Sequence, residues 1–193
     1  MIMNATEVAL QEVRAELAAM RAEIQEARDR QAILDCLATY CRGVDRHDEE
    51  LILAAFHPDA VDEHGKSVHG MPEFAAVVNA GHAASTRMHT HNLTTHSCVI
   101  EGDEARAETY VLAGLASADE TQVRLCGARY LDRLARRDGE WRILHRKVLI
   151  EWMLTGDASF FHSAVNQERG YAVGRRDRED PAYALFAKEG RHG

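Results

Sequence analysis

The chain has 193 residues and a mass of 21.6 kDa, which is the length of a single folded domain. With 46% hydrophobic and 28% charged residues, its composition excludes a disordered or collagen-like chain. The 23 Lys and Arg against 31 Asp and Glu give a net charge of −8, which disfavours nucleic acid and anionic membranes as partners. No apolar run approaches the roughly 18 residues of a membrane span.

Two further features concern the compartment. The first twenty residues carry several charged side chains, which argues against a secretory signal. The four cysteines form no Cys-x-x-Cys pair, so we expect reduced thiols and a cytoplasmic protein. These cysteines are Cys36, Cys41, Cys98 and Cys126.

The chain divides into three parts by pattern: an N-terminal helical arm (1–30), a domain (31–154) and a tail (155–193). In the arm, apolar residues alternate in steps of three and four, which is a heptad pattern. Such a helix either lies on its own domain or pairs with another helix, and the pattern leaves both open. The heptad residues are Leu10, Val13, Leu17, Met20, Ile24 and Ala27.

From Gln31 a different apolar stripe predicts the first helix of the domain. We expect Gly43 to weaken this helix and to turn Asp45 inward. A short helix over 49–56, a polar hairpin over 61–69 and a third helix over 72–84 follow. The stripe consists of Ile33, Leu37, Tyr40 and Val44.

Residues 87–154 predict four antiparallel strands, at 88–100, 105–116, 122–136 and 141–153. The last turn contains Asp138-Gly139, a hairpin signal. Helices followed by a strand meander indicate an α+β fold, in which a bent sheet wraps around about three helices and leaves a pocket between them.

Histidines on the first long strand are the main candidates for chemistry. His89 and His91 share one face by the period of two, whereas His96 falls on the other face unless a bulge intervenes. A carboxylate such as Asp45 across the pocket would orient an imidazole and raise its basicity. Tyr40 lies on the apolar stripe and needs a partner for its hydroxyl if it is buried.

Other kinds of site fit less well. Asp45, His89 and His91 would offer a metal two nitrogens and an oxygen, but no further ligand stands at a diagnostic spacing, so we predict no metal. Nucleophile elbows, phosphate loops and dinucleotide fingerprints are absent from the sequence. Arg146 lies in an apolar row, where it is either a structural ion pair or an anchor for a substrate oxygen.

At this point the sequence resembles the SnoaL-like branch of the nuclear transport factor-like superfamily, over about 31–154. The resemblance is carried by four stretches of sequence. They are Tyr40-Cys-Arg-Gly-Val-Asp45, Leu53-Ala-Ala-Phe-His-Pro-Asp-Ala60, His91 through Gly102-Asp103-Glu-Ala105, and Arg129-Tyr-Leu-Asp-Arg133 through Gly139-Glu-Trp-Arg-Ile-Leu-His-Arg146.

The resemblance implies an activity as well as the cone-shaped fold. The scytalone and bile-acid dehydratases of this superfamily use a Tyr, an Asp and a His without metal or organic cofactor. Tyr40, Asp45 and His91 match those positions, with His89 as a competitor for the histidine role. We therefore expect a dehydratase, or an isomerase, acting on a small hydrophobic oxygenated molecule such as a polyketide, steroid or aromatic intermediate. The alternative is a non-catalytic domain like the small subunit of ring-hydroxylating dioxygenases.

Three residues complete the expected pocket: Tyr110, Arg146 and Phe160, with the tail aromatic closing the mouth. We also expect a homo-oligomer, dimer or trimer, in which the outer face of the sheet is buried. Cys126, Tyr130 and Leu134 are assigned to that outer face.

Overall fold

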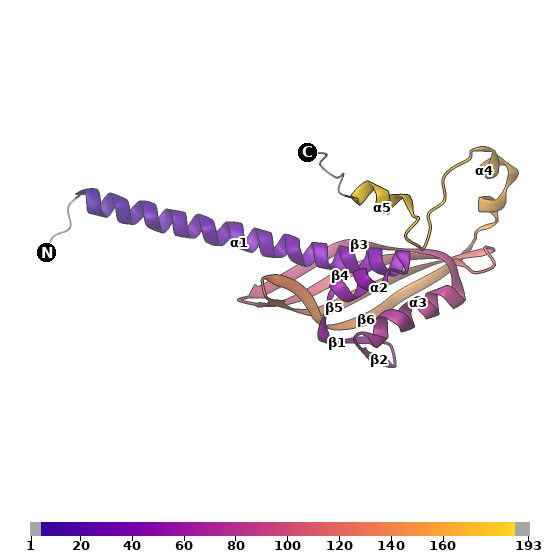
Figure 1. Ribbon diagram of the computed structural model, residues 1–193, viewed down its shortest axis with the longest axis horizontal. Coiled ribbons are helices and arrows are strands. Elements are labelled where there is room, and N and C mark those ends of the chain that lie inside the picture. Colours follow the sequence, from indigo (N-terminus) through magenta and orange to yellow (C-terminus); the bar gives the residue numbers. More distant parts are fainter. Residues whose placement is uncertain (1–4, 188–193) are drawn as a thin grey trace.

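The computed structural model describes residues 5–187 of the chain. A long helix, α1 (Ala5–Arg46), leads into a curved, unclosed sheet of six strands, and a short C-terminal tail returns toward the end of that helix (Figure 1). None of the helices within residues 5–187 combines the length and apolarity needed to cross a lipid bilayer.

The elements follow the predicted order of helices first and strands afterwards. The helices of the domain are α1, α2 (Glu49–Ala54) and α3 (Glu73–Ser85), and the strands are β1 (Phe56–His64), β2 (Ser67–Gly70), β3 (Thr86–Glu101), β4 (Glu104–Ser117), β5 (Gln122–Arg137) and β6 (Glu140–Asp157). The tail forms a 3₁₀ turn, η1 (Ser159–His162), and two short helices, α4 (Ala164–Glu168) and α5 (Pro181–Phe186).

The sheet has the order β2-β1-β6-β5-β4-β3. The four long strands pair antiparallel, as predicted, with Asp138 and Gly139 at positive φ in the last turn. The sheet is nevertheless mixed, because β1 pairs parallel with β6. The α+β class and the cone-shaped arrangement of helices on a bent sheet are confirmed, and the purely antiparallel sheet is corrected.

The expected helix break at Gly43 is wrong. α1 continues through Gly43 to Arg46, so the arm and the first domain helix are a single helix of 42 residues. The glycine serves close packing instead: a Cβ at this position would lie 2.7 Å from the backbone nitrogen of Ile52 in α2. A side chain of any size would therefore push the two helices apart.

The assignment of strand faces also needs correction. Cys126, Tyr130 and Leu134 are buried in the core, on the face of the sheet that the helices cover. The register explains this, because Tyr130 lies beside Thr109 and Val148, whose side chains are buried as well. The outer face carries the alternate residues of the same strands.

The helix α1 is fixed to the domain where the arm leaves it. Asp29 is only 7% exposed and accepts hydrogen bonds from two neighbouring strands. Nη1 of Arg136 in β5 donates two, at 2.8 and 2.9 Å, and Nε1 of Trp141 in β6 donates one, at 2.9 Å. Burial alone would raise the pKa of Asp29, but the bonds from Trp141 and Gln25 and the charge of Arg136 outweigh it and lower the pKa. This carboxylate is therefore charged and paired at neutral pH.

We expect Asp29→Ala to lower the free energy of unfolding by about 1–3 kcal/mol, because it leaves the buried indole N–H of Trp141 without its acceptor and removes one of the two carboxylates that pair with Arg136. Chemical denaturation followed by circular dichroism measures the change. Asp35→Ala is the matched control, since Asp35 is exposed and bonds only Gln31 on the same helix. Equal effects of the two variants would contradict the anchoring role.

Candidate functional site

A carboxylate at the end of α1 holds a histidine of β3. Asp45 accepts a hydrogen bond from Nδ1 of His91 at 2.7 Å and another from the His91 backbone N–H at 3.0 Å. The two bonds fix both the ring and its strand relative to the helix. Because Nδ1 donates to the carboxylate, Nε2 is the ring nitrogen left to accept a proton.

The neighbouring histidine is held differently. His89 is 1% exposed, and its Nε2 donates to the carbonyl of Val44 at 3.0 Å. Its Nδ1 lies 3.3 Å from the hydroxyl of Thr86, while Nε2 is 3.8 Å from the nearest Asp45 oxygen. Of the two strand histidines, His91 is therefore the one that the carboxylate orients, and His89 is part of the wall.

Two more imidazoles surround the pair. His82 of α3 stacks on His89 with ring centroids 4.1 Å apart and meets His91 edge-on at 5.7 Å, and His47 lies 5.4 Å from His89. Burial lowers the pKa of His82 to about 4, with the charges of His91 and His47 acting in the same direction. Burial also lowers the pKa of His89 to about 3, and the charge of His82 adds to this. Both rings are neutral at physiological pH.

The tail closes on this group from outside. Arg176 donates to the carbonyl of Thr86 at 2.6 Å and to its hydroxyl at 3.1 Å. Farther along, Asp180 pairs with Arg46 at 3.3 Å, and the hydroxyl of Tyr183 donates to Asp48 at 2.6 Å. The tail thus contacts the end of α1, the start of α2 and the start of β3.

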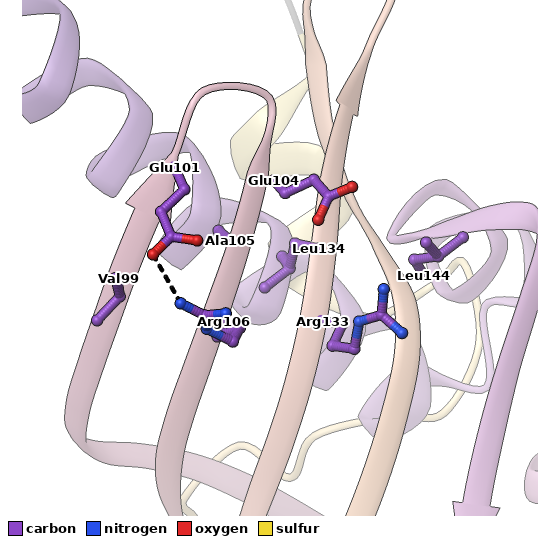
Figure 2. Close-up of a pocket in the computed structure, with 8 residues that line it drawn as sticks. All are labelled: Val99, Glu101, Glu104, Ala105, Arg106, Arg133, Leu134 and Leu144. Carbon is purple, nitrogen blue, oxygen red and sulfur yellow. Dashed lines mark hydrogen bonds and ion pairs between the residues drawn. The ribbon is translucent and has the colours of Figure 1, made fainter.

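A cleft of about 570 Å³ lies between this tail and the strands. One wall is Met88, the residue before His89, and Ala116 lies on the neighbouring strand. On the tail side, Phe161 lines the cleft, whereas Phe160 is 61% exposed. A second, smaller cleft of about 210 Å³ at the opposite end of β3 contains the ion pair of Glu101 and Arg106 (Figure 2).

A buried ion pair lies deeper under the helices. Arg146 is fully buried and makes two parallel bonds to Asp132, from Nε at 2.7 Å and from Nη2 at 2.8 Å. Its guanidinium lies between the rings of Tyr40 and Tyr130, 4.3 and 3.9 Å from their centroids. Within residues 5–187, its Nη1 has no hydrogen-bond partner. The ion pair is structural in its geometry, and the two N–H groups of Nη1 remain available to a ligand.

The predicted site residues thus fall into four places, one of which is the tail turn that holds Phe160. Asp45 and His91 are in contact. Tyr40 instead packs against the guanidinium of Arg146, and its burial raises the pKa of its hydroxyl well above the ordinary value. Tyr110 is elsewhere, on the outer face of the sheet, 44% exposed and beneath the guanidinium of Arg129.

A bulge changes the place of His96. The β3–β4 register shifts between Leu93 and His96, so that His96 lies beside Thr109 and bonds its hydroxyl at 2.8 Å. Thr109 is fully buried, which puts His96 on the same face as His91. The expectation of the opposite face, made for a regular strand, is corrected by the extra residue.

Sequence reasoning missed three residues of this interior. Asp62 of β1 is fully buried, and its Oδ2 lacks a hydrogen-bond partner among the residues described. The sequence could have indicated its burial, because Asp62 is two residues from Ala60 in the same strand and therefore on the same buried face. His82 and Arg176 come from α3 and the tail, and no sequence pattern links them to β3.

The ligand atoms of Asp45, His89 and His91 lie within 4.8 Å of one another, close enough for a metal ion. Two of them are already engaged: the Asp45 oxygen bonds His91, and Nε2 of His89 bonds a backbone carbonyl. A cation would have to replace both hydrogen bonds, so the donor set fits an imidazole–carboxylate pair better than a metal centre.

Comparison with known proteins decides the family. Residues 25–147 match the model of the SnoaL-like domain, which is well over half of the chain. The chain belongs to this family. No curated protein matches it.

Solved structures share the fold. Rv3472 of Mycobacterium tuberculosis, a protein of unknown function, is 26% identical over 66% of this chain and 74% of its own, with a TM-score of 0.59. The hexachlorocyclohexane dehydrochlorinase LinA-type3 of Novosphingobium barchaimii is 22% identical over 69% of this chain and 94% of its own (TM-score 0.64). A candidate scytalone dehydratase of Novosphingobium aromaticivorans is 18% identical over 67% and 88% (TM-score 0.61).

We expect the stability of the fold to decrease as the pH falls from about 6.5 to about 4. In this window the unfolded chain binds protons on His82 and His89, whose ordinary pKa is 6.5, while the folded protein keeps both rings neutral. His82→Gln should therefore reduce the loss of Tm between about pH 7 and pH 5, by at least about 2 °C.

Thermal unfolding followed by circular dichroism at the two pH values measures this difference. His69→Gln is the control, since His69 lies on β2 outside the histidine group. If His82→Gln loses as much Tm on acidification as the wild type, the depressed pKa of His82 is refuted.

Proposed function

We propose that this SnoaL-like chain is a cofactor-independent lyase that removes water from a small hydrophobic oxygenated molecule. The observation that carries the proposal is the hydrogen bond between Asp45 and Nδ1 of His91. A histidine held by a carboxylate in this way is a general base, because the carboxylate fixes the tautomer and stabilises the imidazolium that forms. The side chain of Asp45 keeps 12% of its surface exposed and that of His91 keeps 10%, so neither is closed off completely.

The reaction follows from this geometry. Nε2 of His91 takes a proton from the carbon beside a carbonyl, and Asp45 balances the new positive charge. The electron pair of the broken C–H bond forms the double bond as the C–O bond breaks. The imidazolium then returns its proton to the leaving hydroxide, so that water and the unsaturated carbonyl compound are the products. Returning the proton to another carbon instead would isomerise the substrate.

Charge that develops on the carbonyl oxygen needs a donor. Tyr40 is our prediction for this role, with Arg146 beside it. The guanidinium stacked on the ring of Tyr40 favours a partial negative charge near that hydroxyl. Neutral His82 and His89 line the base without competing for its proton, which suits a hydrophobic substrate.

The comparisons support the reaction class by analogy. Two structural neighbours are named for eliminations, the loss of HCl in the dehydrochlorinase and of water in the candidate scytalone dehydratase. The identities of 18% and 22% give the fold, and the reaction is therefore argued from the His91–Asp45 geometry. A cytoplasmic location also belongs to the proposal; all four cysteines are free.

A non-catalytic role is the second candidate. Tyr40, Phe56, Phe74 and Tyr130 fill the space around Arg146 with ring contacts, which is what a subunit without a substrate would show. One structural neighbour is named as a ring hydroxylase, 22% identical with a TM-score of 0.61. A binding or subunit domain has no need of a histidine oriented by a carboxylate, which is why the lyase is preferred.

A screen of β-hydroxy ketones and other alcohols that give enones on dehydration tests the proposal, with product formation read by absorbance. Turnover of one compound class in buffer without added cofactor is the expected result. Activity that disappears with a chelator and returns with one metal ion would assign the same histidines to a metal centre. No turnover of any member, together with tight binding of the same ligands, would favour the binding role.

On an active substrate, His91→Ala should lower the turnover at least about 100-fold, because it removes the base. Asp45→Asn should lower it as well, since the amide cannot balance the imidazolium. Asn92→Ala is the matched control, because Asn92 follows His91 in β3 and its exposed side chain bonds the outer neighbour Leu112. Circular dichroism verifies that each variant is folded. A fully active His91→Ala would refute the mechanism.

Tyr40→Phe separates packing from chemistry at the buried aromatic layer. The ring and its contacts stay, and only the hydroxyl is lost, so the fold should be kept while the turnover drops about 10²–10³-fold. Steady-state kinetics should show the loss in kcat rather than in KM. Unchanged kcat would remove Tyr40 from the reaction and leave it as a core residue.

A further inference from the structure

The first half of α1 exposes an apolar stripe that its own domain does not cover. Every described side chain from Thr6 to Arg28 is exposed, and the arm projects away from the sheet (Figure 1). The stripe repeats every seven residues, with Leu10, Leu17 and Ile24 at the positions labelled a and Val13 and Met20 at the positions labelled d. These five side chains are 47–52% exposed.

Charges of opposite sign border the stripe on its two sides. The g positions, just before each a, hold Glu16 and Glu23. The e positions, just after each d, hold Arg14, Arg21 and Arg28. In a parallel pair of helices, each g residue faces the e residue of the next heptad on the partner, five positions later. Glu16 would face Arg21 of the partner subunit and Glu23 would face Arg28 of the partner subunit, four attractive pairs in a symmetric dimer.

The antiparallel arrangement is disfavoured by the same residues. It would bring g against g and e against e, which opposes glutamates to glutamates and arginines to arginines. The charge pattern therefore selects two parallel helices in register. A second copy of this chain supplies that pattern.

The domain leaves room for the partner helix. Asp29, which fixes α1 to the sheet through Arg136 and Trp141, occupies the f position, on the side of the helix opposite to a and d. Ile33 and Leu37 continue that domain side and are fully buried. The apolar stripe consequently points away from the domain along the whole arm, and a partner helix on it would not contact the sheet.

We propose that the chain forms a parallel, in-register homodimer through a coiled coil of residues 10–28. The paired arms form a stalk, and the two SnoaL-like domains lie at the same end of it, on opposite sides. The proposal is independent of the reaction proposed above, because it uses no residue of the histidine group.

Light scattering and sedimentation of the full chain test the interface. The wild type should have the mass of two chains of 21.6 kDa each at micromolar concentration. Glu16→Arg with Glu23→Arg turns all four pairs repulsive and should weaken dimerisation at least about 10-fold. Adding Arg21→Glu and Arg28→Glu to that variant restores opposite charges at every pair and should restore the dimer. Failure of this restoration would refute the assigned register.

Cysteine cross-linking tests the direction of the helices. Val13→Cys places two thiols face to face in a parallel dimer, so mild oxidation should join the chains. Ala15→Cys, at the f position away from the partner, is the matched control and should stay uncrosslinked, as should the wild type. A monomeric or a trimeric mass would overturn the proposal. A dimer that neither charge reversal nor Val13→Cys affects would also overturn it, because its interface would then lie outside the arm.

Discussion

The two hydrogen bonds that Asp45 accepts from His91 join the last turn of α1 to the first half of β3, and the candidate site depends on that contact. A carboxylate on a helix end can reach a strand ring only if helix and strand keep one relative position. Asp29 fixes the same helix to the far end of the sheet, through Arg136 and Trp141. Between these two carboxylates α1 runs for about 24 Å as one rigid element. The geometry of the Asp45–His91 pair is therefore set in part by packing outside the site.

The interior also holds a second charged group, the buried ion pair of Arg146 and Asp132. A guanidinium taken out of water costs several kcal/mol unless it is paired and bonded. Arg146 meets that condition through the two parallel bonds to Asp132 and through the faces of Tyr40 and Tyr130. An apolar residue of similar volume would pack here without that cost. The two parallel bonds of Arg146 to Asp132 join β6 to β5 in one register, which an apolar residue would not specify.

Much of this could be predicted from the sequence, because local patterns set it. Turn residues such as Asp138-Gly139 divided the chain into the long strands. The Asp45–His91 contact was expected from the family resemblance, but with a helix break at Gly43 that does not occur. What could not be predicted depends on the pairing of strands. The bulge that brings His96 to the inner face adds one residue without a sequence signal, and the parallel pairing of β1 with β6 hides Asp62 in the core. Partners from distant segments, such as Arg176, depend on how the tail returns.

The contact at Gly43 bears on the position of the tail, through α2. α2 crosses α1 there at backbone distance, and its N-cap is Asp48, which also accepts the hydroxyl of Tyr183 from the tail. The distance between α1 and α2 therefore sets where the tail attaches to Asp48. The same tail carries Arg176, which binds the carbonyl of Thr86 beside His89. The absence of a side chain at Gly43 thus allows the close distance between α1 and α2. The position of the tail beside Thr86 is therefore set in part by a glycine of α1, at the point where α2 crosses it.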